Sequence, residues 1–184
     1  MNSLDALREL LVPNILKDLV NIHGKTCARL KENSPHAKLK QIDILGVPAN
    51  SILIKLDEYA QPSTLFKNDK GQRKRCDYIL FFHIQNQGIV LFIELKSNKV
   101  KNPEVIRQFK GSECVLDYCN ATLKRFHNHD TLLENFSKRF IVFYKPRISK
   151  KRTRPMIKPN NTIPENALKY PATKNISLKS IIAL

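Results

Sequence analysis

Three ionisable residues, Asp77, Glu94 and Lys96, lie at the ends of two strongly apolar segments, residues 76–82 and 90–96. Short apolar runs separated by a polar break are typical of neighbouring β-strands. Side chains alternate along a strand, so Glu94 and Lys96 project from the same face. Their relative position matters, because carboxylates and an ammonium on one face can bind a ligand together.

The polar segment between the two runs predicts a hairpin turn centred on Asn86 and Gln87. In that register, Asp77 lies directly opposite Lys96. Directly opposed residues share a face, so the hairpin brings Asp77, Glu94 and Lys96 together. The sequence therefore predicts a cluster of two carboxylates and one ammonium.

Such a cluster is suited to divalent-metal chemistry. Mg²⁺ prefers hard oxygen ligands, so Asp77, Glu94 and the backbone carbonyl of Leu95 are candidate ligands, and Mn²⁺ could substitute. A bound Mg²⁺ acidifies its water and neutralises charge on a phosphate, which are the two requirements for phosphodiester hydrolysis. Lys96 could orient or deprotonate the attacking water, or stabilise charge that develops on phosphorus.

A structural interpretation of the same residues is an ion pair between Glu94 and Lys96 at a strand end, with Asp77 capping a loop. The apolar residues around Glu94 argue against it, because they indicate a central, buried strand. Charge in such a place is costly unless something binds it. Buried charges that gather at one end of a sheet favour a functional site.

Asp77 together with Glu94-Leu95-Lys96 resembles the D…(D/E)xK signature of the PD-(D/E)XK nuclease superfamily, which includes restriction endonucleases, RecB-type nucleases and archaeal Holliday junction resolvases. The resemblance covers roughly residues 50–145, and Cys76 takes the place of the proline. It implies an α/β fold with a restriction-endonuclease-like core, in which a central mixed β-sheet is flanked by helices. It also implies a Mg²⁺-dependent nuclease.

The resemblance adds two further expectations about the site. Related nucleases often take an additional acidic residue from the N-terminal helix, and Glu32 and Glu9 are ranked above Asp18 for that role. Gln108 resembles the glutamine that follows the ExK strand in RecB-like and resolvase-like members, where it could hold the water or the scissile phosphate. The alternative for Gln108 is an exposed helix residue.

The remaining pattern supplies the elements around this hairpin. Apolar residues at helical spacing predict helices over residues 3–32, with a kink at Pro13. Residues 50–59 predict the first core strand. Asn102 followed by a proline predicts the start of a long helix, and residues 139–145 predict a further buried strand. A strand, a hairpin, a crossover helix and another strand make an α/β sandwich.

The composition changes after residue 145, so we expect a single nuclease-like domain over residues 1–145 and a basic, proline-containing extension over residues 146–184 that packs on it. Seven cations and no acid occupy fourteen residues at this boundary, and they are interpreted as a nucleic-acid-binding arm rather than a solvated basic loop. The seven are Lys145, Arg147, Lys150, Lys151, Arg152, Arg154 and Lys158.

The overall charge favours a polyanionic partner. Lys and Arg total 32 against 16 for Asp and Glu, a formal net charge of +16. No apolar run is long enough for a membrane span, and no signal peptide is evident, so a cytoplasmic protein is expected. None of the four cysteines forms a CxxC pair, which argues against a zinc ribbon.

These features predict a Mg²⁺-dependent endonuclease, acting on DNA rather than RNA, in restriction, phage defence, mobile-element or repair contexts. It could act as a homodimer or with a larger ATPase or recognition subunit. One alternative is a catalytically inactive nucleic-acid-binding module of nuclease fold. Another is an assembly subunit whose basic tail contacts RNA or an acidic protein.

Overall fold

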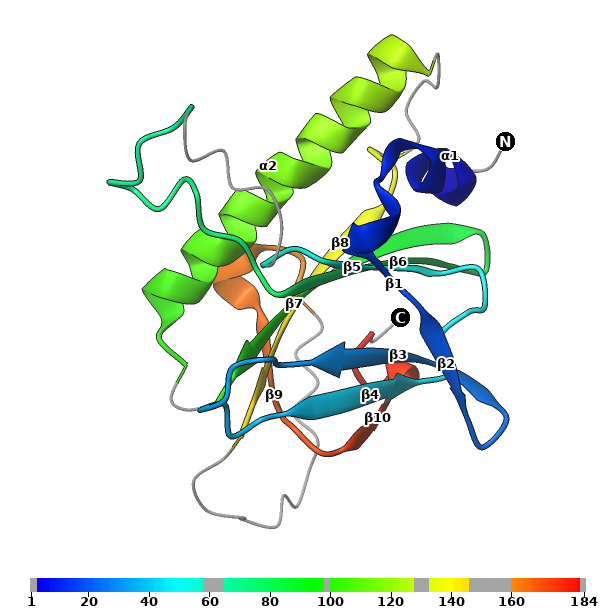
Figure 1. The fold of residues 1–184 in the computed structure, drawn as a ribbon, viewed down its shortest axis with the longest axis vertical. Coiled ribbons are helices and arrows are strands. Elements are labelled where there is room, and N and C mark those ends of the chain that lie inside the picture. The colour runs from blue at the N-terminus through cyan, green and yellow to red at the C-terminus, as the bar shows by residue number, and fades with distance from the viewer. Residues whose placement is uncertain (1–2, 58–64, 98–99, 128–132, 146–159, 183–184) are drawn as a thin grey trace.

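The computed structural model describes residues 3–57, 65–97, 100–127, 133–145 and 160–182. Its elements form three layers: α-helices, a six-stranded β-sheet and a four-stranded β-sheet (Figure 1). The six-stranded sheet lies in the middle, with one apolar core toward the helices and another toward the smaller sheet. The fold is therefore α/β with two mixed sheets. Among the described residues, α1 and α2 pack on the same face of the central sheet, and the smaller sheet covers the other face.

The central sheet combines antiparallel and parallel pairing. Neighbours are antiparallel from β1 to β7 and parallel from β7 to β9. In spatial order its strands are β1 (Leu16–Lys17), β5 (Ile52–Lys55), β6 (Tyr78–Ile84), β7 (Gln87–Lys96), β8 (Ser137–Tyr144) and β9 (Leu168–Pro171).

The predicted hairpin is present as β6 and β7, but its turn lies one residue earlier than expected. Gln85 and Asn86 form the two-residue loop, with φ angles of 48° and 66° that suit the right-handed twist of the strands. The observed register sets Asp77 level with Glu94, not with Lys96. Because side chains alternate with a period of two, this two-residue shift leaves the three side chains on one face.

The long helix α2 (Asn102–Phe126) begins one residue before the predicted start, with Lys101 rather than Asn102 at the N-cap, and connects β7 to the parallel strand β8. Its apolar stripe packs on the central sheet. The ring of Phe109 meets Phe140 edge-on at 5.2 Å, and Phe92 stacks on Phe140 at 4.8 Å between ring centroids. The prediction of a buried strand over residues 139–145 is confirmed within one or two residues.

The prediction of helices over residues 3–32 is wrong beyond the first turns. Only α1 (Ser3–Leu10) forms, and Leu4 and Leu7 are buried on it. His23 and Gly24 then adopt φ angles of 49° and 75°, which closes a two-residue hairpin and excludes a continuous helix. After α1, this segment forms the 3₁₀ turn η1 (Pro13–Ile15), the strand β1, and the strands β2 (Leu19–Ile22) and β3 (Lys25–Lys31).

The smaller sheet combines three strands from residues 19–45 with one strand from residues 175–177. Its order is β10 (Asn175–Ser177), β4 (Gln41–Leu45), β3 and β2. β10 pairs in parallel with β4, and β9 pairs in parallel with β8, so residues 160–182 contribute one strand to each sheet. The short turns η2 (Pro164–Asn166) and η3 (Leu178–Ser180) flank these strands.

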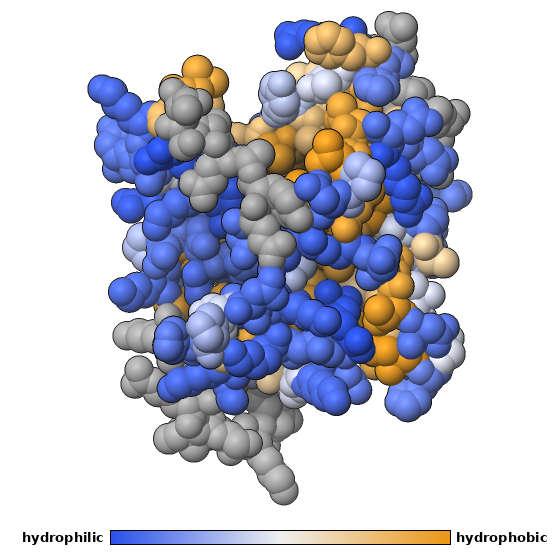
Figure 2. All heavy atoms as spheres, viewed as in Figure 1, coloured by the Kyte–Doolittle hydropathy of each residue, from blue (hydrophilic) through white to orange (hydrophobic). Residues whose placement is uncertain are grey.

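Figure 2 shows a face that is mostly hydrophilic, where hydrophobic side chains form a strip rather than a broad patch. Within the parts of the chain that the structure describes, neither helix has the length and apolarity needed to cross a membrane.

Candidate active site

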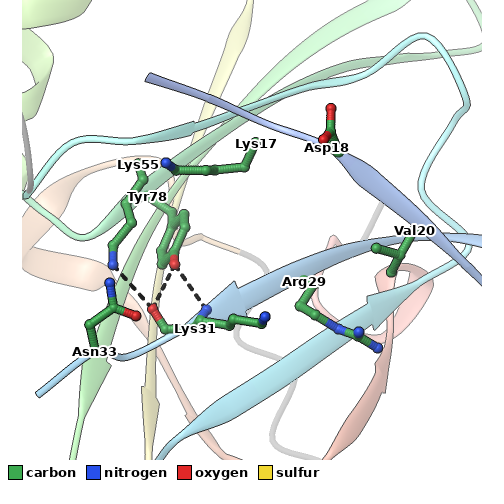
Figure 3. A pocket seen from close by; sticks show the side chains of 8 residues that line it. All are labelled: Lys17, Asp18, Val20, Arg29, Lys31, Asn33, Lys55 and Tyr78. Carbon is green, nitrogen blue, oxygen red and sulfur yellow. Dashed lines mark hydrogen bonds between the residues drawn. The ribbon is translucent and has the colours of Figure 1, made fainter. Parts of the chain in front are cut away.

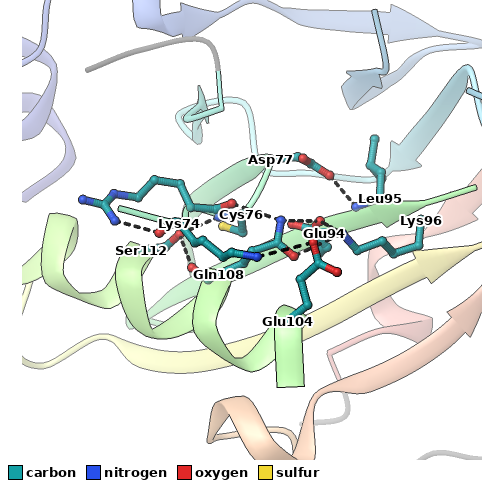
Figure 4. Close-up of polar contacts among 10 residues, drawn as sticks. Lys74, Cys76, Asp77, Glu94, Leu95, Lys96, Glu104, Gln108 and Ser112 are labelled. Carbon is teal, nitrogen blue, oxygen red and sulfur yellow. Dashed lines mark hydrogen bonds and ion pairs between the residues drawn. The ribbon is translucent and has the colours of Figure 1, made fainter. Parts of the chain in front are cut away.

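The candidate site lies where β6 and β7 meet the N-terminal half of α2 (Figure 4). Asp77 immediately precedes β6, and Glu94 and Lys96 lie within the last three residues of β7. All three lie on the face of the central sheet that packs against α2, because the alternate residues Ile79 and Phe92 contribute to that core. The structure therefore brings the predicted trio together.

Gln108 of α2 joins the two charged residues of β7. The Lys96 ammonium lies 2.6 Å from Glu94 Oε1 and donates a hydrogen bond of 3.1 Å to Gln108 Oε1. The Gln108 amide nitrogen donates to Glu94 Oε1 at 2.8 Å and to the Arg75 carbonyl at 3.3 Å. Gln108 thus lies with Glu94 and Lys96, and it is half-buried rather than an exposed helix residue.

Asp77 is held by the neighbouring strand. Its Oδ2 accepts a 2.5 Å hydrogen bond from the backbone N–H of Leu95. An extended residue directs its N–H and its carbonyl to the same side of the strand, so the Leu95 carbonyl also faces the Asp77 side. This orientation is compatible with the predicted role of that carbonyl as a ligand.

Both carboxylates are withdrawn from solvent. Glu94 is 1% exposed and Asp77 is 9% exposed. Glu94 Oε2 is buried, and it accepts no hydrogen bond from the residues described. A buried oxygen of this kind is costly unless it binds a proton donor or a cation. The donor set therefore fits a small hard cation.

The protein environment raises the pKa of both carboxyl groups, so each binds a proton more tightly than it would in water. Burial raises the pKa of Glu94 to about 7, although the charge and hydrogen bond of Lys96 and the Gln108 amide oppose the rise. Burial and the nearby charge of Glu94 raise the pKa of Asp77 well above its ordinary value. Burial is the largest influence on the pKa of Lys96 and lowers it, but the charge of Glu94, its hydrogen bond to Lys96, and the charges of Asp77 and Glu104 together outweigh burial, so the pKa is raised overall. The site thus favours a bound proton or cation.

A hollow of about 310 Å³ adjoins the site and shares Gln108 with it. Three consecutive cations, Arg73, Lys74 and Arg75, line it together with Asp57 and Glu104. The Lys74 ammonium lies 3.6 Å from Glu104 Oε1, as an ion pair. With three cations against two acids, these residues place a net positive charge beside the two buried carboxylates.

Asp57 is a site residue that the sequence did not single out. It lies two residues after the end of β5, and its charge contributes to the raised pKa of Asp77. The signal for it was an acid at the end of the strand next to β6. It was missed because residues 50–59 were all assigned to one strand.

The predicted additional acids lie elsewhere, which corrects that expectation. Glu9 is exposed on α1. The Glu32 carboxylate accepts a 2.9 Å hydrogen bond from the Ser34 N–H, beyond the end of β3 in the smaller sheet. Asp18 lines a separate hollow between the sheets. No hydrogen bond or ion pair among the described residues connects these three carboxylates to Asp77 or Glu94.

Of the predicted basic arm, only Lys145 belongs to the described residues. Its ammonium donates a 3.2 Å hydrogen bond to the Lys38 carbonyl, and its backbone N–H donates to the Lys96 carbonyl at 3.2 Å. Lys145 therefore lies next to the end of β7. The other six, Arg147, Lys150, Lys151, Arg152, Arg154 and Lys158, lie outside the described residues.

Gly111 sets how closely α2 approaches the segment before Asp77. A Cβ at this position would lie 2.0 Å from the Lys74 carbonyl oxygen. One residue on, Ser112 Oγ accepts a 2.8 Å hydrogen bond from the Cys76 N–H. This close packing holds Gln108 within reach of the Arg75 carbonyl.

The Gly111→Ala variant is expected to be less stable than the wild type by about 1–3 kcal/mol, because the added methyl group overpacks a backbone contact. Helix propensity alone predicts the opposite sign, about 1 kcal/mol of stabilisation. Thermal or urea unfolding distinguishes the two, with Asp117→Ala on the exposed side of α2 as the control. A Gly111→Ala protein that is more stable than the wild type would contradict the packing described.

No family model, curated protein or solved structure matches this chain. Within the part of the chain that the structure describes, no three His, Cys, Asp or Glu side chains are grouped to hold a metal ion. The candidate ligands proposed above are two carboxylates and a backbone carbonyl, a set with fewer than three such side chains.

Proposed function

We propose that this protein is a metal-dependent nuclease that hydrolyses phosphodiester bonds in DNA. One observation carries the proposal: Asp77 and Glu94 are buried side by side, next to Lys96, and Glu94 Oε2 has no hydrogen-bond donor among the described residues. The succession of antiparallel hairpin, crossover helix and parallel strand supports the assignment of a restriction-endonuclease-like core.

Asp77, Glu94 and the Leu95 carbonyl would hold Mg²⁺, or Mn²⁺ in its place. When bound, the ion supplies a water of lowered pKa and neutralises charge on the phosphate. The raised pKa values of both carboxyls support this assignment, because a cation replaces the protons that the buried site otherwise retains.

The other residues of the site would orient the reacting groups. The Lys96 ammonium is fixed by Glu94 and Gln108, so it can hold a nucleophilic water or a phosphate oxygen at a defined position. Gln108 has its carbonyl and its amide nitrogen both engaged, which fixes the geometry of Lys96 and Glu94 relative to α2. The cationic hollow beside Gln108 would receive the flanking phosphates of the strand.

The net charge of +16 supports a nucleic-acid substrate, and we favour DNA. The basic residues from Lys145 to Lys158 would add sequence-independent contacts to the phosphate backbone of the DNA. We further propose a cytoplasmic protein that acts in restriction, phage defence, mobile-element or repair contexts, as a homodimer or with a larger ATPase or recognition subunit.

A second candidate function is nucleic-acid binding without cleavage. The observation that favours it is the short ion pair of 2.6 Å between Lys96 and Glu94, an arrangement that also stabilises a purely structural site. Salt-sensitive DNA binding without cleavage in any divalent metal would indicate this function.

The nuclease proposal predicts that the purified protein nicks supercoiled plasmid in Mg²⁺ or Mn²⁺ and not in excess chelator. A panel of labelled duplex, single-stranded, branched and RNA substrates identifies the preferred one. Binding of the same substrates in chelator, measured by fluorescence anisotropy, separates a protein that cannot bind from one that cannot cleave. Binding with no cleavage of any substrate in either metal would reject the proposal.

A further inference from the structure

A basic segment, residues 65–75, lies beside the N-terminal half of α2, next to the candidate site (the teal loop in Figure 1). Gly71 packs against the side chain of Arg107, since a Cβ on Gly71 would lie 3.0 Å from Arg107 Cδ. Further along, the Lys74 carbonyl packs on Gly111 of α2. The segment then continues into β6, so both α2 and the central sheet fix its position.

Hydrogen bonds within the segment hold its turn. The Gly71 N–H donates to the Asn68 carbonyl at 3.2 Å, and Gly71 has a φ of 84°, which glycine adopts without strain. The Asp69 carboxylate accepts hydrogen bonds from the Gln72 amide at 2.9 Å and from the Lys70 N–H at 3.0 Å. The one acid of residues 65–75 is therefore engaged within the segment.

The segment carries a strong positive charge. Its five cations and one acid give a formal excess of four. Glu104 and Arg107, the charges of α2 that lie against it, are opposite in sign, and Asp57 in the adjoining hollow lowers the excess to three. Lys67 and Lys70 are exposed, and neither ammonium is bonded to another residue that the structure describes. A surface of this charge attracts a polyanion. The five cations are Lys67, Lys70, Arg73, Lys74 and Arg75.

Two apolar side chains are exposed at the start of the segment. Leu65 is 75% exposed and Phe66 is 51% exposed. Phe66 directly precedes the exposed Lys67, so an aromatic ring and an ammonium are presented together. This combination suits unpaired nucleotides, because the ring stacks on a base while the cation contacts a phosphate. In an intact duplex the bases already stack on one another, so the ring finds no free base there.

We propose that residues 65–75 bind an unpaired DNA strand beside the cleavage site, with Phe66 stacked on a base and Lys67 and Lys70 in contact with phosphates. Residues 73–75 continue the positive charge into the hollow that adjoins the two carboxylates, so a strand held on the segment leads to them. The choice of DNA rests on the proposed nuclease function. The segment adds a preference for single-stranded or locally opened DNA over an intact duplex.

The test measures binding in excess chelator, where metal-dependent cleavage cannot take place. Fluorescence anisotropy gives the affinity for a short labelled single strand and for the duplex of the same sequence, over a series of salt concentrations. The wild type is expected to bind the single strand about tenfold more tightly than the duplex, because only the single strand offers a base to Phe66.

Phe66→Ala is expected to weaken single-strand binding about tenfold and to leave duplex binding unchanged, because it removes a stacking partner and no charge. Phe66→Tyr should retain the wild-type affinity, since it keeps an aromatic ring. Phe126→Ala is the matched control. Phe126 is an aromatic residue, 78% exposed, at the other end of α2, and its removal should leave binding of both substrates unchanged.

Lys67→Gln and Lys70→Gln test the phosphate contacts. Each is expected to reduce the slope of log affinity against log salt concentration by about 0.7, the value for one phosphate contact with a single strand. Lys31→Gln is their matched control, because Lys31 is an exposed cation of β3 that lines a separate hollow between the two sheets (Figure 3). Its slope should equal that of the wild type.

A tenfold loss in Phe66→Ala, together with reduced salt slopes in both lysine variants, supports the surface. Equal binding of single strand and duplex by the wild type, wild-type affinity in Phe66→Ala, or similar losses in the two control variants overturns it. A protein that shows the expected binding pattern but cleaves no substrate in Mg²⁺ or Mn²⁺ loses the nuclease assignment and keeps this surface. A protein that cleaves DNA while Phe66→Ala binds normally keeps the nuclease assignment and loses this surface.

Discussion

The Glu94→Gln variant is expected to cleave plasmid DNA in Mg²⁺ at least about 10³-fold more slowly than the wild type. A carboxylate that holds a metal contributes several kcal/mol to transition-state stabilisation, and about 4 kcal/mol corresponds to that factor. The amide has the size of the carboxylate and can still accept the hydrogen bond of Lys96, so the local packing is kept. The variant should therefore still fold, and its main effect should be on cleavage.

Glu104→Gln is the matched control for this experiment. Glu104 lies in the first turn of α2 and lines the hollow that adjoins the site. Its carboxylate Oε1 lies 3.6 Å from the Lys74 ammonium, but the Glu104 side chain is 44% exposed. Its removal is expected to change the cleavage rate less than about threefold, since exposed ion pairs contribute little. DNA binding in chelator should be similar for both variants and the wild type. A Glu94→Gln protein that retains a tenth or more of the wild-type rate would exclude Glu94 as a required ligand.

The parts of the fold that the sequence predicted well were those with strong local signals. The apolar runs after Asp77 and before Glu94 indicated a hairpin, and Asn102 with the following proline marked the start of α2. The grouping of the site was insensitive to the error in the turn, because a shift of two residues leaves every side chain on its own face. A shift of one residue would have separated Asp77 from Glu94.

The smaller sheet was not predicted, because its pairing is not local. β10 at residues 175–177 pairs with β4 at residues 43–45, and nothing in either short segment specifies the other. The spacing of Leu16, Leu19 and Val20 also fits a helix, and only the left-handed backbone at His23 and Gly24 resolves the ambiguity in favour of a hairpin.

The absence of Glu9 and Glu32 from the site follows from the same error. Both were expected to reach the site from the helices predicted over residues 3–32. The segment instead divides between α1 and the smaller sheet, and Glu32 follows β3 on the far side of the central sheet. The acid that does lie near Asp77 is Asp57, because β5 pairs with β6 and its end brings Asp57 alongside.

In excess chelator, the wild-type protein is expected to lose stability as the pH rises from about 5 to 8. The pKa of Glu94 is about 7 in the folded protein, against an ordinary value of 4.5. Between these values the unfolded chain has released the proton that the folded protein retains, so raising the pH favours unfolding. The full difference corresponds to roughly 3 kcal/mol, and it is complete once the pH exceeds the folded pKa. The raised pKa of Asp77 acts in the same direction.

Urea unfolding of the wild type and of Glu94→Gln across this pH range measures the effect, with Glu104→Gln as the control. The free energy of unfolding should fall less steeply with pH in the variant than in the wild type. The histidines and all other shared titratable groups contribute equally to both proteins, so their contributions cancel in the comparison. Lys96 does not contribute within this range, since its pKa is raised above 10.5. Mg²⁺ should stabilise the wild type more at pH 8 than at pH 5, because the ion competes with protons for the same carboxylates. Equal pH slopes for the wild type and Glu94→Gln, together with no stabilisation by Mg²⁺, would show that the buried carboxylate binds neither proton nor metal as argued.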